Sequence, residues 1–386
     1  MNSAVVVDCC RTPIGRAHPE KGVFRDVRSD DLAVAVLSQL IQRTGIDPAE
    51  IEDVLLGNTQ QQMEQWFNIA RIVSLMAGLP SSAGGVTINR LCGSSLQALN
   101  QASHAILAGG EDVQIVGGLE HMQHIPMDSG IDFNPKLFHV TSKGALHMGF
   151  TAEFLAQSQG ISRKDQDAFA LASHQKAAAA TQEGLFTNEI IPVWGRDEAG
   201  SREQITNDQC IRGDTNVESL AALKPAFMPG IGTVTAGNSS PLNDGAAAML
   251  IMSESKANSL GLKPLVKIRA TAVAGVDPAV MGTGPVPATQ KALQRAGLTL
   301  EDIDLVELNE AFASQSLACL RMLKLDESKV NVRGGSIAIG HPLGASGARI
   351  STTLIHAMLT SDATLGLATM CIGIGQGIAT VFERCE

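Results

Sequence analysis

The sequence predicts an α/β fold with a largely parallel sheet, assembled from a unit that occurs twice. Three observations lead to this prediction. Short β-type runs alternate with helical segments along the first third of the chain, which is typical of strands joined by helical crossovers. A similar series of segments returns 251 positions later. A long segment of different character, roughly 118–241, separates the two copies.

The first copy contains four β-type runs, SAVVVD, DVLLGN, VTINR and DVQIVGG. Helices are expected between these runs, near Asp31–Gln42 and through Ile69–Ala77. A third helix is expected directly after Cys92, because apolar residues recur there at steps of three and four positions: Leu96, Leu99, Ala102 and Ile106. Gly109 and Gly110 then end this helix.

The second copy repeats this order. IEDVLLGN, which ends at Asn58, resembles DIDLVELN, which ends at Asn309. The same offset carries Cys92 into GHPLGASGARISTTLIHAM, a glycine-rich turn that leads into another helix with Ile350, Leu354 and Met358 on one face. DVQIVGGLEHM has a looser counterpart in LGLATMCIGIGQG. A duplicated α/β unit explains all three matches.

The segment between the copies begins with EHMQHIPMDSGIDFNPKLFHVTSKGALHMGF, which has no clean period. A helical stretch and a polar region follow, and AAAMLIMSE then returns the chain to the first unit. Long insertions on a rigid scaffold commonly carry substrate contacts. We therefore expect a first half at 1–117 plus 242–265, a substrate-binding loop domain at 118–241, and a second half at 266–386.

Composition excludes several classes of protein. The 386 residues are 44% hydrophobic and 18% charged, as in ordinary globular proteins, and the net charge of −10 disfavours a nucleic-acid surface. The start of the chain, MNSAVVVDCCRTP, resembles no signal peptide, and no apolar run is long enough to cross a membrane. The seven scattered cysteines form neither zinc-type pairs nor a disulfide scaffold, so we expect a reducing cytoplasm and no metal.

Cys92, in INRLCGSSLQALN, has two possible interpretations. An isolated cysteine is commonly a buried structural thiol. The start of a helix, however, offers unpaired N–H groups that lower the pKa of a thiol, and the small residues that follow allow a substrate carbonyl to approach the backbone. The residues alone leave both interpretations open.

Three further motifs carry candidate chemistry. His341 stands between Gly340 and Pro342 in a restricted turn, and Cys371 ends a strand-like run before a glycine-rich turn. That turn lacks the spacing of a dinucleotide-binding loop, so we exclude one. Asn309, at the end of another strand-like run, suits either a crevice or a helix cap. Two cysteines and a histidine suit carbon–carbon chemistry next to a thioester, which needs a nucleophile and a separate acid/base.

The motifs NRLCGSS, NEAFA, GGSIAIGHPLGASGAR and CIGIGQG together resemble the four catalytic blocks of the thiolase family, in the same order. Accompanying blocks, among them DCCRTPIGR, HMGFTAE and MGTGPVPA, extend this resemblance over nearly the whole chain. The 118–150 loop and the ending GQGIATVFER are most similar to the thiolase subunit of the bacterial fatty-acid oxidation complex. The resemblance implies two mixed five-stranded sheets in an αβαβα arrangement, with an inserted loop domain.

The resemblance also implies roles for individual residues. Cys92 becomes the acylated nucleophile, His341 takes its proton, and Cys371 is the acid/base for carbon. Asn309 holds a water that forms one oxyanion hole with His341, while the N–H groups of Cys92 and Gly373 form the other. Eleven further residues would contact coenzyme A or substrate: Arg212, Ser219, Ala226, Phe227, Ala236, Ser240, Leu242, His147, Met148, Ala311 and Phe312. No role follows for Trp66, Cys9 or Cys10.

The expected reaction is thiolysis of 3-ketoacyl-CoA by CoA, with CoA as a co-substrate and no permanently bound cofactor. The alternatives are the biosynthetic condensation of two acetyl-CoA molecules and, from a different class, a non-catalytic acyl-CoA-binding protein. A decarboxylating condensing enzyme fits less well, because such enzymes carry a histidine where Cys371 stands. The resemblance further implies a cytoplasmic homodimer that assembles with a larger hydratase/dehydrogenase subunit into a heterotetramer.

Overall fold

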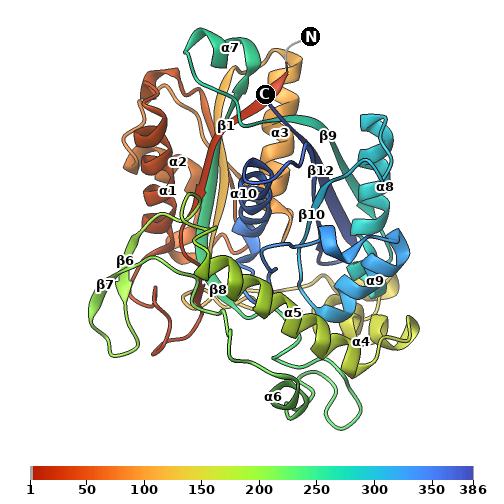
Figure 1. Ribbon diagram of the computed structural model, residues 1–386. Coiled ribbons are helices and arrows are strands. Elements are labelled where there is room, and N and C mark those ends of the chain that lie inside the picture. Colours follow the sequence, from red (N-terminus) through yellow and green to blue (C-terminus); the bar gives the residue numbers. More distant parts are fainter. Residues whose placement is uncertain (1–2, 386) are drawn as a thin grey trace.

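The computed structural model describes residues 3–385, and Figure 1 shows them arranged in five layers. Helices α1 (Ser29–Thr44) and α2 (Ile69–Met76) cover one outer face of a large sheet. Helices α8 (Pro285–Ala296) and α9 (Ala313–Leu323) cover the opposite outer face. Helices α3 (Ser94–Ala108) and α10 (Ser346–Leu359) pack against each other between the two parts of the sheet. The expected α/β class and αβαβα layering are therefore confirmed.

The sheet consists of two halves with the same strand order. The first half runs, in spatial order, through β4 (Val86–Ile88), β3 (Asp53–Gly57), β5 (Val113–His121), β8 (Asn243–Ser253) and β1 (Ala4–Arg11). The second half continues through β9 (Val266–Gly275), β12 (Gln376–Arg384), β11 (Leu365–Ile372) and β10 (Leu305–Leu308). The short strand β2 (Gly15–Arg16) pairs with β8. Corresponding strands thus occupy corresponding places in the two halves.

Two details of the sheet differ from expectation. The sheet is mixed, as the resemblance implied, and not largely parallel, as the alternating pattern predicted, because β8 and β12 run antiparallel to their neighbours in each half. Two residue pairs between β1 and β9 also join the halves into one ten-stranded sheet instead of two sheets of five. In the second half, a single parallel bridge between Val306 and Val330 stands where the first half has β4. Pairings between distant segments leave no local periodicity, so the alternating pattern did not reveal them.

The register of the strands supports the duplication. In the first half Gly57 pairs with Gly118 between parallel strands β3 and β5, and in the second Leu308 pairs with Thr369 between β10 and β11. Both members of the second pair stand 251 positions after those of the first, the offset read from the sequence. Helices α3 and α10 follow the same offset to within one residue at the start.

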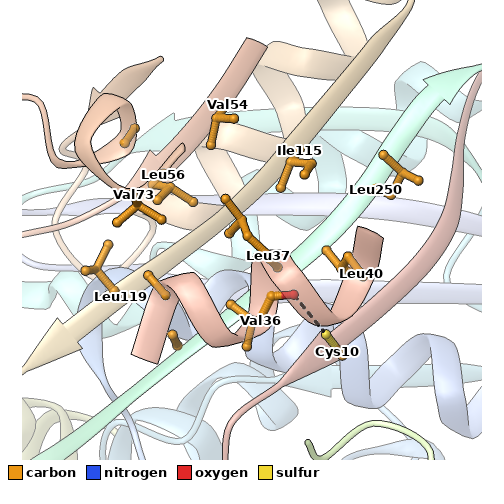
Figure 2. Close-up of a cluster of buried hydrophobic side chains, with 14 of the residues drawn as sticks. Cys10, Val36, Leu37, Leu40, Val54, Leu56, Val73, Ile115, Leu119 and Leu250 are labelled. Carbon is orange, nitrogen blue, oxygen red and sulfur yellow. Dashed lines mark hydrogen bonds between the residues drawn. The ribbon is translucent and has the colours of Figure 1, made fainter. Parts of the chain in front are cut away.

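The core on the outer side of the first half is apolar and closely packed. Figure 2 shows Leu37 and Leu40 of α1 facing the sheet residues Val54, Ile115 and Leu250. In the same cluster the Sγ atom of Cys10 donates a hydrogen bond to the carbonyl oxygen of Val36. Burial raises the pKa of this thiol and that of its neighbour Cys9. Both cysteines are therefore structural.

The expected faces of the two central helices are buried. Leu96, Leu99, Ala102 and Ile106 of α3 share one cluster with Ile350, Leu354 and Met358 of α10. Gly109 closes α3 in the left-handed conformation, with φ of 73°, as its position after the helix predicted.

The inserted segment lies at one end of the layers, below them in Figure 1. It contains α4 (Met148–Ser158), α5 (Arg163–Gln182), the hairpin of β6 (Val193–Arg196) and β7 (Arg202–Ile205), and α6 (Val217–Ala221). Helix α7 (Glu254–Ser259) lies at the opposite end. The buried Arg11 of β1 contacts Glu189 at 2.6 Å and Asp208 at 2.7 Å, which fastens the insertion to the sheet. The limits proposed for three domains stay a prediction, and residues 1–2 and 386 lie outside the described part.

No helix within residues 3–385 combines the length and apolar character needed to span a membrane.

Candidate active site

Cys92 occupies a tight turn between β4 and α3. Its neighbour Leu91 has a positive φ of 45°, which lets the chain reverse before the helix begins. The hydroxyl of Ser94 closes this turn, since it accepts from the N–H of Arg90 at 2.9 Å and donates to the carbonyl of Leu91 at 2.6 Å. The turn also presses against the end of β11, where a Cβ atom on Gly93 would lie 2.7 Å from Ile372. Cys92 therefore sits at the start of α3, partly exposed and beside β11.

The resting thiol of Cys92 is protonated. Burial raises its pKa to about 11, although the N–H groups of Gly373 and of Cys92 itself donate toward the sulfur and lower it. The negative charge of Glu120 raises the pKa further. The expectation that the helix start would favour a thiolate is therefore wrong for the resting protein, because desolvation outweighs the amide donors. A base has to accept the thiol proton when Cys92 reacts.

His341 lies directly before α10, in the position equivalent to the Cys92 turn. Its backbone N–H donates to Oδ1 of Asn243 at 2.8 Å, and its Nδ1 lies 2.6 Å from the hydroxyl of Ser346. Burial lowers the pKa of His341 to about 3, and the nearby charge of Arg349 lowers it as well. The imidazole is therefore neutral near pH 7, so one of its ring nitrogens carries no proton and can accept one.

The packing of α3 on α10 brings the two turns together. The N–H of Ala348 donates to the hydroxyl of Ser95 at 2.9 Å. A Cβ atom on Gly347 would lie 2.3 Å from the backbone nitrogen of Leu96, so the first turns of the two helices touch through their backbones. Small residues at this crossing are what allow Cys92 and His341 to belong to one site.

Asn309 faces His341 from the end of β10. Its Nδ2 lies 3.5 Å from Nε2 of His341, and its Oδ1 accepts from the hydroxyl of Ser336 at 2.6 Å. The side chain of Arg349 donates to Ser336 in turn, at 2.5 Å. With its oxygen occupied, Asn309 presents its N–H₂ group toward His341. The capping alternative is not observed, because Phe312 is the cap of the following helix α9.

Cys371 is buried at the end of β11, within an apolar cluster. The cluster includes Ala311, Phe312, Met148 and Phe227, four of the residues expected to contact substrate. Burial raises the pKa of Cys371 well above its ordinary value, and the neighbouring Cys92 raises it further. The two thiols are therefore neighbours, and both are protonated at rest.

The expected coenzyme A contacts fall into an inner and an outer group. His147, Phe227 and Phe312 form a row of rings with centroids 5.7 and 6.1 Å apart, which leads toward Cys371. The backbone N–H of Ser240 donates to the carbonyl of Ala311 and joins this inner group.

The outer group lies on exposed parts of the insertion: Arg212, Ser219, Ala226, Ala236 and, at the segment's end, Leu242. Two of these residues have local partners. Arg212 contacts the ring of His174, and Ser219 belongs to the capping box of α6.

Glu310, the neighbour of Asn309, points away from the thiols. Its carboxylate accepts from the hydroxyl of Ser173 at 2.7 Å, from Nδ2 of Asn331 at 2.7 Å and from the N–H of Ile337 at 3.1 Å. It lines a cavity of about 580 Å³ between α5 and α9 that contains none of the candidate catalytic residues. Glu310 therefore holds the loop that carries Ser336 rather than acting in the site.

Sequence reasoning missed the residues that orient the candidates. Ser346, Ser336 and Arg349 are fully buried polar residues: Ser346 contacts His341, Ser336 contacts Asn309, and Arg349 donates to Ser336. Glu120 accepts from the N–H of Gly344 at 2.9 Å and so holds the His341 turn. All four lie within motifs read from the sequence, but their side-chain directions depend on tertiary packing. Among residues 3–385, no group of three or more histidine, cysteine, aspartate or glutamate side chains is arranged to bind a metal.

Comparison with known proteins gives full-length matches. Residues 4–255 match the family model described as the thiolase N-terminal domain, and residues 262–384 match the thiolase C-terminal domain. A protein of Shewanella loihica named 3-ketoacyl-CoA thiolase is 58% identical over the whole of both chains. Proteins of the same name from Aliivibrio fischeri and Aeromonas salmonicida are 57% identical over the same extent.

Proposed function

The chain belongs to the thiolase family, and we propose that it cleaves 3-ketoacyl-CoA with CoA, giving acetyl-CoA and an acyl-CoA shortened by two carbons. It is an acyltransferase, and this reaction is the last step of fatty-acid β-oxidation. The observation that supports the proposal is a pair of neighbouring thiols, Cys92 and Cys371, and a neutral imidazole paired with an oriented amide, His341 and Asn309, on turns that the packing of α3 on α10 brings together.

In the first half-reaction the sulfur of Cys92 attacks the 3-keto carbon while His341 accepts the thiol proton. The resulting oxyanion would be held by the N–H groups of Cys92 and Gly373, which already donate toward the sulfur. Preorganised donors of this kind typically contribute about 100-fold or more in rate each. Collapse of the adduct then breaks the bond between the second and third carbons, and the electron pair passes to the acetyl-CoA fragment as an enolate.

Cys371 completes this half-reaction by donating its proton to the enolate carbon. Asn309, through a bound water, and the protonated His341 would stabilise the enolate oxygen. Because burial keeps the Cys371 thiol protonated, it can serve as the acid for carbon. Acetyl-CoA departs, and the shortened acyl chain remains as a thioester on Cys92.

In the second half-reaction the thiol of CoA attacks this thioester. Its proton passes to Cys371, the acyl group passes to CoA, and His341 returns its proton to Cys92. A thioester is exchanged for a thioester, so this transfer has little free-energy cost. The same residues serve the reverse condensation, and the long 118–150 loop favours the degradative direction with longer chains.

The test is the substitution Cys92→Ser. We expect thiolysis of 3-ketoacyl-CoA to fall at least 1000-fold, since removal of a nucleophile from a catalytic group costs about this much or more. The control is Cys385→Ser, because Cys385 directly follows the last strand, β12, and is not a candidate site residue. This variant should keep full turnover. Wild-type turnover in the Cys92 variant would contradict the assignment of Cys92 as the nucleophile. Absence of turnover from the wild-type protein would instead leave the non-catalytic acyl-CoA-binding alternative.

We further propose that the chain acts in the cytoplasm as a homodimer, together with a hydratase/dehydrogenase subunit in a heterotetramer. An exposed apolar surface beside the open edge of β4 supports the homodimer. Seven residues form this surface, which we call the β4-edge surface: Met63, Trp66, Phe67, Ile72, Leu75, Met76 and Val86. Apolar side chains gathered at an open sheet edge mark a place for a second chain. Co-purification with mass analysis tests for the larger subunit.

A further inference from the structure

Two residues beside the candidate oxyanion donors have left-handed backbone conformations without being glycine. Leu91, directly before Cys92, has a φ of 45°, and Ile374, directly after Gly373, has a φ of 63°. Side chains disfavour this conformation, and for a β-branched residue such as isoleucine it is a true outlier. Strain of this kind collects at functional sites when the surrounding structure enforces it.

The surrounding structure does enforce it. Ile372 pairs with Gln376 between β11 and β12, so Gly373, Ile374 and Gly375 form a three-residue hairpin loop. The N–H of Val276 donates to the carbonyl of Gly375 at 2.8 Å. Arg90 donates to Oε1 of Gln376 at 2.8 Å and so connects the Leu91 turn to this hairpin. The two strained residues are therefore held as one unit.

Packing does not explain an isoleucine at this position. Ile374 is 38% exposed and not buried in the core, and glycine would adopt the same backbone without strain. Apolar side chains lie close to the neighbouring Gly373: an added Cβ would lie 3.1 Å from Cδ1 of Leu91 and 3.3 Å from Sδ of Met148. Apolar side chains thus surround the amide that donates toward Cys92.

We propose that Ile374, together with Leu91, forms an apolar lip that contacts the acyl chain carried by Cys92, and that Ile374 determines preference for long chains. This inference rests on the proposed function. Leu91 directly precedes Cys92, and Ile374 directly follows Gly373, whose N–H group donates toward the Cys92 sulfur. An acyl chain on that sulfur would therefore pass these side chains, and its contact area with them would grow with chain length. Hydrophobic contact of this kind discriminates chains by the methylenes it covers.

Two substitutions separate apolar contact from backbone rigidity. Ile374→Gly removes the side chain and relieves the strain, whereas Ile374→Asn removes the apolar group but keeps a residue that tolerates the left-handed conformation. Lys324→Gly is the matched control, because Lys324 has a φ of 56° at the end of α9 and lies outside the site. The measurement is kcat/KM for 3-ketoacyl-CoA substrates of four, eight, twelve and sixteen carbons.

For both Ile374 variants we expect the ratio of sixteen-carbon to four-carbon kcat/KM to fall about tenfold, while the control keeps the wild-type ratio. Equal losses at every chain length, or a loss in the glycine variant alone, would show that only loop rigidity matters and would overturn the inference. Absence of thiolysis from the wild-type protein at all chain lengths would overturn the proposed function itself.

Discussion

The two thiols of the site have different surroundings, and these suit them to different steps. Cys92 is partly exposed and receives two backbone N–H groups, so a charge on its sulfur or on a bound carbonyl oxygen can be stabilised. Cys371 is enclosed by apolar side chains and lacks such compensation beyond its own N–H group. The first environment suits a nucleophile, and the second suits an acid that stays protonated until a carbanion forms.

Replacing Cys371 by alanine should therefore separate the two half-reactions. Thiolysis of 3-ketoacyl-CoA should fall about 1000-fold or more, because no acid remains for the enolate carbon. Exchange of labelled CoA into acyl-CoA forms no carbanion and needs Cys371 only to accept the thiol proton of CoA, which water can also accept, so we expect it to fall much less. Rapid-quench measurement of both reactions checks this difference, and equal losses would count against a separate acid/base role.

At the scale of elements, two helices and the turns before them build the site. Helices α3 and α10 cross at their first turns, and the turn before each helix carries one candidate residue, Cys92 or His341. The ends of strands β10 and β11 supply Asn309 and Cys371. The position of α3 therefore matters for catalysis. Its start is held by the hydrogen bonds of Ser94 and by its packing on α10, and its end is closed by Gly109.

The far end of α3 offers a test of stability that does not disturb the site. Gly109 closes the helix at φ of 73° with open space around it, so Gly109→Ala should cost about 1 kcal/mol through backbone strain alone. Gly110→Ala is the matched control, since its added Cβ would make only an ordinary 3.5 Å contact. Urea unfolding measures both, and a Gly109 variant as stable as the control would contradict the assigned cap.

At the scale of the whole molecule, the duplicated halves share one site instead of having one each. The offset of 251 places Glu120 of β5 where β11 has Cys371, and Asn58 where β10 has Asn309. Glu120 does not act as an acid in this arrangement: its carboxylate accepts from Thr59, Gln65 and the N–H of Gly344. One copy thus contributes the nucleophile and a structural support, and the other contributes the remaining chemistry.

The proposed homodimer can be tested on the β4-edge surface. Trp66, which is 61% exposed, should be an anchor of the contact, so Trp66→Glu should weaken dimerisation about 100-fold or more. Trp194→Glu is the control, because Trp194 is 50% exposed on the separate β6–β7 hairpin. Sedimentation velocity over a range of concentrations measures both. A monomeric wild-type protein, or an unchanged Trp66 variant, would contradict the proposed surface.

The sequence by itself determined the α/β class, the duplication and its offset, the helix after Cys92 and the four motifs that carry the candidate residues. These features depend on local periodicity, turn chemistry and residue type, all of which can be read directly from the order of residues along the chain. The sequence also showed the resemblance that assigns the motifs to one reaction. The alternating pattern did not show the mixed sheet, which only the resemblance implied, because antiparallel partners such as β1 and β8 stand more than two hundred positions apart.

Only the tertiary structure decided the state and orientation of the groups. The protonated thiol of Cys92 and the neutral ring of His341 follow from burial, which no local pattern reports. The amide of Asn309 is oriented by Ser336 and Arg349, which approach it from other parts of the chain. Residue types and spacing name the participants in a reaction. Their charges and directions arise only when distant segments exclude water and supply hydrogen-bond partners.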